Sequence, residues 1–387
     1  MTEKVLMKGN EAIAEAAILA GCKCFFGYPI TPQNEIPEYM AKRMPKVGGV
    51  FLQAESEVSA INMVYGAAGA GARVMTSSSS PGISLKQEGI SYIAGADLPC
   101  VIVNIVRGGP GLGGIQPAQS DYFQTVKGGG HGDYKLVALA PSSVQEAVDL
   151  VTDAFDMADQ YRVPVIILGD GILGQMMEPI TFTKKEQKVL PAKDWATTGT
   201  QGKRKRNIVN SLYIDPNELD QLVRDRFKRY DEIENNEVRY EMIECEDADI
   251  VLVAYGTTAR IAKNAMWEAR NQGYKVGLIR PITLWPFPKE AFEKTVLTAK
   301  AFLTVEMSMG QMVEDVRLAV NGAKPVHFYG KTGGLVPVPP EIVGEIKKIS
   351  KEPDERGCMG EQYAQHTTSP GRQNAVFAKQ KFRGGEK

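Results

Sequence analysis

Short apolar runs alternate with longer segments of helical periodicity over the first half of the chain. The apolar runs have the length of buried strands, and they fall at residues 24–26, 73–76, 101–106 and 163–168. The segments between them carry apolar side chains three and four positions apart, and they predict helices at residues 10–20, 56–69 and 143–159. A chain in which strands and helices alternate builds a parallel sheet with helices on both faces.

Single residues indicate where several of these elements begin and end. Asn10 is expected to cap the first helix, and Gly21 stands where helices commonly end in a left-handed residue. A serine-rich turn is expected at residues 77–80, in front of Pro81-Gly82. Residues 1–180 are therefore predicted to form one α/β domain.

The pattern changes in the middle of the chain and returns on a smaller scale. Residues 181–247 are predicted to form a connector, because they hold a Gly/Thr-rich loop and a charged helix with one apolar stripe. In residues 248–350, Thr257 opens a helix, and strands are expected at 250–254, 275–279, 301–305 and 325–328. Residues 351–387 lack apolar periodicity, so we expect them to be disordered or ordered only against a partner. The predicted fold class is α/β, with two doubly wound, mostly parallel-sheet domains.

Composition places the chain among ordinary globular proteins. It has 387 residues, of which 43% are hydrophobic and 24% charged, and its formal net charge is −1. This balance gives no sign of binding to nucleic acid or to an anionic membrane. No apolar run approaches the roughly 18–20 residues of a transmembrane helix, and Glu15 interrupts the apolar N-terminal stretch at 12–20, as in a packed helix. A cytoplasmic location is expected.

The cysteines and histidines predict no metal site. The five cysteines form no Cys-x-x-Cys pair, and they are Cys22, Cys24, Cys100, Cys245 and Cys358. An iron–sulfur cubane needs about four thiolates at short spacings. The three histidines, at 131, 327 and 366, are also far apart. If the protein takes part in redox chemistry, we expect the electron carrier to lie elsewhere.

Two glycine motifs and a basic cluster have competing interpretations. Residues 109–114 match G-x-G-x-x-G after a strand, but proline inside and after the motif favours a mobile loop over a substrate rather than a dinucleotide site. Gly169-Asp170-Gly171 is similar to the start of a motif that binds Mg²⁺ and a diphosphate. That motif also needs an asparagine further along the chain, and the next one, Asn207, is too distant, so Asp170 is interpreted as a turn residue. The basic residues 203–206 favour a solvated loop; a contact to another subunit or to coenzyme A phosphates is the alternative.

Three polar residues follow the carboxyl ends of predicted strands or begin a helix. Thr31 is held between two prolines, Glu57 begins a helix, and Arg107 ends the most apolar strand. Each has an ordinary structural explanation: a turn residue, a helix-dipole partner or a surface ion pair. Ligands of open parallel sheets, however, bind outside the carboxyl ends of strands. Their shared position makes the three residues a candidate site.

At these residues the sequence resembles the α subunit of 2-oxoacid:ferredoxin oxidoreductases. The matching stretches are 27–32, 57–66, 76–82, 193–199, 281–288 and Arg107 with its glycine loop. The connector and the loop at 127–134 are most similar to the branched-chain, 2-oxoisovalerate members, with the 2-oxoglutarate members close behind. The resemblance extends over residues 5–350.

The resemblance implies a domain for the aminopyrimidine of thiamine diphosphate at 1–180 and a domain like the transketolase C-terminal domain at 248–350. It implies oxidative decarboxylation of a 2-oxoacid to an acyl-CoA, with coenzyme A as co-substrate and ferredoxin as acceptor. The diphosphate and Mg²⁺ would belong to a β subunit. The [4Fe–4S] clusters would lie on partner subunits, which include a γ subunit and a ferredoxin-like δ subunit.

The resemblance also implies roles for single residues. Glu57 falls at the glutamate that hydrogen-bonds the aminopyrimidine ring, and a carboxyl group can share a proton with a ring nitrogen. Arg107 falls at the arginine that pairs with the substrate carboxylate. A guanidinium can donate two parallel hydrogen bonds to such a group. Thr31 falls at the threonine that hydrogen-bonds the 2-oxoacid, and Tyr28 and Pro29 are expected to contact the cofactor. The rival classes are a nicotinamide or flavin oxidoreductase and a non-catalytic scaffold subunit.

Overall fold

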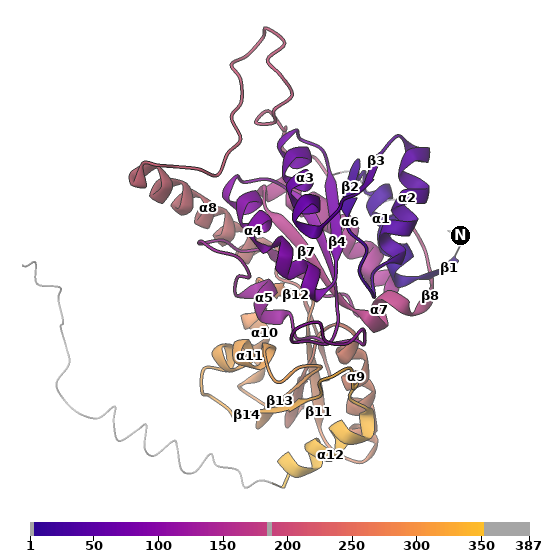
Figure 1. The fold of residues 1–387 in the computed structure, drawn as a ribbon. Helices are drawn as coiled ribbons and strands as arrows, with labels where there is room; N and C mark the ends of the chain where they lie inside the picture. Colours follow the sequence, from indigo (N-terminus) through magenta and orange to yellow (C-terminus); the bar gives the residue numbers. More distant parts are fainter. Residues whose placement is uncertain (1–3, 184–187, 352–387) are drawn as a thin grey trace, which may run out of the picture. The chain divides into compact units, whose positions relative to one another are not determined.

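The computed structural model describes residues 4–183 and 188–351, and all statements below concern these residues. They form a seven-stranded sheet, a five-stranded sheet and a two-stranded ribbon (Figure 1). The predicted tail, 351–387, lies outside this range apart from Lys351. Among the described helices, none has the length and apolar character needed to cross a membrane.

The first sheet has the strand order β12-β6-β7-β5-β4-β2-β3. Its strands are β2 (Cys24–Gly27), β3 (Val50–Gln53), β4 (Val74–Ser78), β5 (Cys100–Val106), β6 (Val137–Leu139), β7 (Pro164–Asp170) and β12 (Thr283–Trp285). All neighbours pair in parallel except β12, which runs antiparallel to β6. Every residue of β5 and β7 is buried, which explains their continuous apolar sequences.

Helices cover both faces of this sheet, as predicted. In Figure 1, α3 (Glu57–Gly69) and α4 (Ser80–Gly95) lie in front of the strands, and α6 (Val144–Tyr161) lies behind them. Helix α1 (Gly9–Leu19) packs on α6, and α3 packs on α4. Shorter elements are α2 (Glu35–Arg43), the 3-10 helix Met44–Val47, α5 (Tyr122–Val126) and α7 (Gly171–Gln175). The ribbon pairs β1 (Val5–Lys8) with β8 (Met177–Ile180).

The second sheet has the strand order β14-β13-β10-β11-β9. Its strands are β9 (Tyr240–Ile243), β10 (Ile250–Val253), β11 (Val276–Pro281), β13 (Ala301–Glu306) and β14 (Val326–Gly330). The four strands expected in this half are therefore confirmed, and β9 is an additional antiparallel edge. The helices of this half are α9 (Gly256–Asn271), α10 (Lys289–Thr295), α11 (Met312–Val320) and α12 (Pro339–Ile349), and α8 (Pro216–Asn236) precedes them.

Two strands do not follow the predicted domain boundaries. Strand β9 comes from the predicted connector but pairs with β11 of the second sheet. Strand β12 comes from the second half of the chain but pairs with β6 of the first sheet. The division at residues 180, 247 and 350 remains a prediction, and the pairing of β12 with β6 makes the first sheet depend on the second half of the chain.

Two local predictions were wrong. Asn10 does not cap α1: Lys8 is the N-cap residue, and the buried Asn10 side chain donates from Nδ2 to Pro32 O at 2.8 Å and to Glu35 Oε2 at 2.7 Å. Residues 77–80 do not form a turn, because Ser77 and Ser78 end β4 and Ser80 begins α4. In both cases long-range contacts override the local preference of a small polar residue. Gly21, in contrast, has the expected positive φ of 87°.

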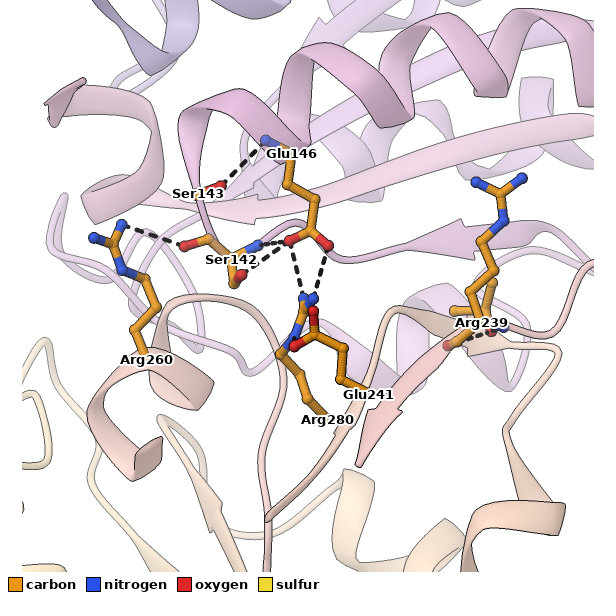
Figure 2. Close-up of polar contacts among 8 residues, drawn as sticks. Ser142, Ser143, Glu146, Arg239, Glu241, Arg260 and Arg280 are labelled. Carbon is orange, nitrogen blue, oxygen red and sulfur yellow. Dashed lines mark hydrogen bonds and ion pairs between the residues drawn. The ribbon is translucent and has the colours of Figure 1, made fainter. Parts of the chain in front are cut away.

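Ion pairs join elements of the two halves (Figure 2). Arg280 of β11 donates from Nη1 and Nη2 to Glu146 of α6 at 2.9 and 2.8 Å, and from Nε to Glu241 of β9 at 2.9 Å. Ser142 donates from its backbone N and its Oγ to Glu146 Oε2 at 2.7 and 2.9 Å. This network fixes the N-terminal end of α6 against the second sheet.

We expect Arg280→Met to destabilise the chain by about 1–3 kcal/mol, because it leaves the largely buried Glu146 carboxylate without its charged partner. Urea denaturation of the purified chain measures the change. The matched control is Lys294→Met, which removes the exposed ion pair with Glu290 and should leave the unfolding midpoint unchanged. Equal effects of the two substitutions would contradict a stabilising role for the Arg280 network.

Candidate functional site

The candidate residues lie at the carboxyl edge of the first sheet, where the strand order reverses. The chain runs from β2 outward to β3 and then returns to the other side of β2 as β4. Ligands of doubly wound folds bind at such a switch point. Thr31 follows β2, Glu57 follows β3 and Arg107 follows β5. The topology thus brings the three residues to one edge of the sheet.

Glu57 is a buried carboxylate in the first turn of α3. Ser56 caps the helix by accepting from Ser59 N at 3.2 Å. The Glu57 residue is 6% exposed, and its carboxylate accepts no hydrogen bond from a described residue. The buried hydroxyls of Ser78 and Ser79, at the end of β4, are also without hydrogen-bond partners in the described part of the chain. Buried polar groups are normally satisfied, so these groups indicate a site for a polar ligand.

A glycine allows Glu57 to lie against the backbone of α4. A Cβ atom on Gly82 would lie 2.7 Å from Glu57 Oε1 and 2.1 Å from Ser78 Oγ. Both distances are shorter than a carbon–oxygen contact allows. The carboxylate and the serine hydroxyl therefore converge on the same point beside the first turn of α4.

We expect Gly82→Ala to weaken binding of a ligand at Glu57 and to cost about 1–3 kcal/mol of stability, because the new methyl group overlaps two side chains. Gly66→Ala in α3 is the control, since a Cβ at Gly66 meets no atom within 4 Å and alanine favours a helix. Thermal unfolding of both variants measures the difference. A stable, ligand-competent Gly82→Ala protein would show that the carboxylate is free to move.

Arg107 is also buried, and its guanidinium ties two loops together. It donates from Nη1 to Thr31 O at 2.9 Å and from Nη2 to Leu112 O at 3.1 Å. Its Nε is buried and has no hydrogen-bond partner in the described structure. The residue is 6% exposed. The structure therefore joins Arg107 to Thr31 directly, through a carbonyl group that the sequence did not suggest.

The backbone of Arg107 is held by a small network at the start of α4. Arg107 N donates to Ser80 Oγ at 3.1 Å. Ser80 Oγ in turn donates to Asp121 Oδ2 at 2.7 Å, and Asn104 Nδ2 donates to the same oxygen at 2.9 Å. Burial raises the pKa of Asp121. The network links the ends of β4 and β5, so Glu57 and Arg107 flank one helix start.

The loop after β2 presents Thr31 at the surface. Thr31 is exposed, and its Oγ1 accepts from Asn34 Nδ2 at 3.3 Å. The fully buried Gln33 holds the loop: Nε2 donates to Tyr28 O at 3.3 Å, and Oε1 accepts from Ser77 Oγ at 2.5 Å. The roles predicted for Thr31, Tyr28 and Pro29 remain predictions, but their loop is anchored to the end of β4 beside the candidate site.

The glycine loop does not have the form of a dinucleotide-binding turn. After Arg107 the chain forms no helix before α5 at Tyr122, whereas a dinucleotide site places the pyrophosphate at a helix N-terminus directly after the strand. The loop closes on itself through Gly114 N, which donates to Gly108 O at 3.0 Å. It also contacts the second half of the chain, because a Cβ on Gly334 would lie 2.2 Å from the Cβ of Gln116. Its function as a substrate cover remains a prediction.

Both carboxylate oxygens of Asp170 are bonded within the protein, and the residue ends β7 and caps α7 rather than lying in a turn. It caps α7, where Oδ1 accepts from Ile172 N at 2.8 Å and from Leu173 N at 3.2 Å, and Oδ2 accepts from the hydroxyl of Thr257. Burial raises its pKa. Within residues 4–183 and 188–351, no group of three or more His, Cys, Asp or Glu side chains is placed to hold a metal ion.

The basic cluster at 203–206 is exposed, as expected of a solvated loop. Within it, Arg204 donates from Nη2 to Ala196 O at 3.0 Å.

Two buried polar residues near the site were missed by sequence reasoning. Gln119 donates from Nε2 to Tyr255 O at 2.9 Å and accepts at Oε1 from Thr258 Oγ1 at 2.7 Å and Met307 N at 3.0 Å. It thereby joins the loop after β5 to the second sheet. Lys86 of α4 is fully buried beside Glu57. In the sequence, neither residue differs from a polar residue on a solvated surface.

Comparisons with known proteins agree with the geometry. The family model "Pyruvate flavodoxin/ferredoxin oxidoreductase, thiamine diP-bdg" matches residues 15–242, and "Pyruvate:ferredoxin oxidoreductase core domain II" matches residues 248–342. The chain is 52% identical to the ketoisovalerate oxidoreductase subunit VorB of Methanothermobacter marburgensis, over 90% of this chain and 98% of the relative. It is 37% identical to the 2-oxoglutarate synthase subunit KorA of the same organism, over 89% and 99%.

Solved structures show the same fold. A 2-oxoglutarate:ferredoxin oxidoreductase from Magnetococcus marinus, with 2-oxoglutarate, coenzyme A and succinyl-CoA bound, superimposes with a TM-score of 0.81 at 29% identity. The match covers 90% of this chain and 65% of that one. A split-gene transketolase shares the fold at a TM-score of 0.57 and 14% identity. The predicted α/β fold class and the family resemblance are confirmed: the chain belongs to the 2-oxoacid:ferredoxin oxidoreductase family, as a subunit that is more similar to the ketoisovalerate members than to the 2-oxoglutarate members.

Proposed function

We propose that this chain provides the aminopyrimidine-binding and 2-oxoacid-binding side chains of a CoA-acylating 2-oxoacid:ferredoxin oxidoreductase. The observation that carries the proposal is the buried carboxylate of Glu57, which lies beside the unpaired hydroxyl of Ser78 at the switch point of a sheet that matches the thiamine diphosphate-binding family model. When bound, thiamine diphosphate supplies the electron sink for decarboxylation of the 2-oxoacid.

The residues around Glu57 fit the aminopyrimidine ring. The ring offers nitrogen donors and acceptors, and the site offers one carboxylate and the unpaired hydroxyls of Ser78 and Ser79. Glu57 would share a proton with a ring nitrogen through Oε1 or Oε2. In a buried site such a hydrogen bond is strong, because no water competes for it. The helix backbone at Gly82 holds the carboxylate in place.

Arg107 and Thr31 would hold the 2-oxoacid. The buried Nε–H of Arg107 is unpaired, and Nη1 and Nη2 each donate to one carbonyl group, so further N–H donors remain for a carboxylate. The hydroxyl of Thr31 is exposed at the same edge of the sheet. A carboxylate bound here would meet a desolvated guanidinium that two loops already orient.

The remaining functions are assigned to partner subunits. A β subunit would hold the diphosphate and Mg²⁺, since the carboxylate of Asp170 already accepts hydrogen bonds from the first turn of α7 and from the hydroxyl of Thr257. A γ subunit and a ferredoxin-like δ subunit with [4Fe–4S] clusters would carry electrons to ferredoxin. The named relatives are themselves subunits of oxidoreductases, which supports this division. The cytoplasmic location stays a prediction.

A branched-chain 2-oxoacid such as 2-oxoisovalerate is the proposed substrate, because the 50–52% identical relatives are ketoisovalerate oxidoreductase subunits. The second candidate is 2-oxoglutarate, which is bound in the Magnetococcus enzyme. Co-purification of the native complex, followed by assays with 2-oxoisovalerate, 2-oxoglutarate, pyruvate and aryl-2-oxoacids, tests both. The assay contains coenzyme A and a viologen dye. Absence of CoA-dependent dye reduction with every 2-oxoacid would overturn the proposed function.

A further inference from the structure

A fully buried lysine lies next to the candidate cofactor carboxylate. Lys86 belongs to α4, and none of its surface is exposed. Its Nζ donates to Thr76 Oγ1 at 2.7 Å and to Ser77 O at 2.9 Å, both on β4. Lysine is almost never fully buried unless it is paired with an opposite charge. The position therefore calls for a functional explanation.

The helix geometry explains how Lys86 comes near Glu57. Gly82 and Lys86 are four positions apart and share one face of α4. On that face the Glu57 carboxylate lies against the helix backbone, as the 2.7 Å distance from a Gly82 Cβ to Oε1 shows. Helical side chains lean toward the N-terminus of their helix, so the Lys86 side chain extends back toward the same turn.

The hydrogen bonds of Lys86 can accommodate the neutral amine as well as the ammonium, because two acceptors satisfy both N–H groups of the amine and two of the three of the ammonium. A lysine ammonium has three N–H donors, and a neutral amine has two. Thr76 and Ser77 are the two acceptors that the described structure provides. Burial lowers the pKa of Lys86 to about 7, and the negative charge of Glu57 acts in the opposite direction. A pKa lowered to this range makes both charge states of Lys86 accessible near neutral pH, and the negative charge of Glu57 favours the ammonium form.

Other ionisable groups surround α4, but they are engaged elsewhere or lie toward other parts of the helix. Arg107 and Asp121 bond to Ser80 in its first turn, and burial raises the pKa of Cys100 on β5 to about 12, which keeps that thiol neutral. Asp170 at the end of β7 caps α7. His131 lies against Tyr92, a turn and a half further along α4. Glu57 is the group whose charge acts on Lys86.

We propose that Lys86 is a positioning residue that stores a proton for Glu57. It holds the proton while the Glu57 carboxylate faces no ligand, and it gives the proton up when the aminopyrimidine of thiamine diphosphate engages that carboxylate. The proton that leaves Nζ compensates for the one that Glu57 and the ring nitrogen must share. This inference rests on the proposed function, since it needs the cofactor ring at Glu57.

The physical reason is competition for one negative charge. Before binding, the attraction of the Glu57 carboxylate favours the ammonium form of Lys86. A ligand N–H that hydrogen-bonds the carboxylate neutralises much of that attraction, and the desolvation of the buried ammonium remains. The pKa of Lys86 then falls, so below its starting value of about 7 the amine releases a proton on binding. Well above that pH, Lys86 is already neutral and has no proton to release.

Calorimetry on the complete complex tests this proton transfer. The complex is freed of cofactor and titrated with thiamine diphosphate and Mg²⁺ in two buffers of different ionisation enthalpy, which gives the number of protons taken up. Near pH 6, the wild-type complex should take up about one proton fewer per cofactor than Lys86→Gln, and near pH 8.5 this difference should disappear. Glutamine keeps N–H donors for Thr76 and Ser77 but cannot be charged. Lys228→Gln, at an exposed lysine of α8, should match the wild type at both pH values.

Equal proton uptake by wild type and Lys86→Gln near pH 6 would overturn the inference and leave the proposed function intact. A complex that binds no thiamine diphosphate would overturn both. If the glutamine variant does not assemble, Lys86→Met replaces it as a neutral residue of similar length. The pH dependence gives a second measurement, because the proton uptake of the wild type should rise by about one proton more between pH 6 and pH 8.5 than that of the Lys86→Met complex. An unchanged difference contradicts the stored proton.

Discussion

Glu57→Gln in the assembled complex is expected to lower kcat by about 10²–10⁴-fold, the range lost when a positioned acid–base group is removed. Glutamine keeps the size of the side chain and its place beside Gly82, so assembly should be normal. It cannot share a proton with a ring nitrogen as a carboxyl group does. Dye reduction with the preferred 2-oxoacid measures turnover, and co-purification of the subunits checks assembly.

Glu55→Gln is the matched control for this substitution. Glu55 lies two residues earlier, is exposed, and hydrogen-bonds only to the Ser59 hydroxyl among the described residues. It carries the same charge near the same helix N-terminus, so a long-range electrostatic effect would appear in both variants. We expect unchanged kcat for Glu55→Gln. Near-normal turnover of Glu57→Gln would remove Glu57 from the catalytic site.

The elements that the sequence predicted well are those whose burial is uniform or whose ends are set locally. All seven residues of β5 are buried, so a continuous apolar run suffices to recognise the strand. Ser56 caps α3 through a residue three positions away. The expected position of Glu57 followed from the helical periodicity of residues 56–69, and the edge shared with Thr31 and Arg107 followed from the parallel arrangement of the strands.

The predictions failed where a polar residue takes its partner from a distant segment. Asn10 bonds to Pro32 and Glu35, which lie more than twenty positions along the chain, so its local preference for a helix cap has no effect. Ser77 and Ser78 continue a buried strand, where the Ser77 hydroxyl donates to Gln33 Oε1 and the Ser78 hydroxyl lies beside Glu57 and Gly82. Gln119 and Lys86 are polar residues inside the fold. No periodicity in the sequence distinguishes them from surface residues.

The same long-range contacts explain why the candidate site depends on the whole fold. The loop that begins at Arg107 reaches the second sheet through Gln119, whose side chain bonds to residues of α9 and of the segment after β13. The second sheet is fixed to the first through Arg280 and Glu146 (Figure 2). The second half of the chain thus supports the loop that begins at Arg107, the proposed substrate-binding residue, even though the proposed ligands contact the first half.

Arg107→Ala is expected to raise KM for the 2-oxoacid by roughly 10²–10³-fold, since removing one partner of a buried, hydrogen-bonded charge pair costs about 2–5 kcal/mol and each 1.4 kcal/mol is about tenfold. Arg107→Lys should recover only part of the loss, because an ammonium keeps the charge but not the fork that reaches Thr31 O and Leu112 O. Steady-state kinetics with a varied 2-oxoacid measure both variants.

The structure adds a second possible cause of an Arg107 defect, and the kinetics can separate the two. If Arg107 acts by binding the substrate carboxylate, KM for the 2-oxoacid rises and KM for coenzyme A stays unchanged. If its main effect is to tie the loop after β2 to the glycine loop, kcat falls and both KM values change together, because the site around Glu57 loses its order. Arg224→Ala is the control: Arg224 pairs with Asp220 on an exposed face of α8, and its loss should leave every constant unchanged. An unchanged KM for the 2-oxoacid in Arg107→Ala would show that another residue holds the carboxylate.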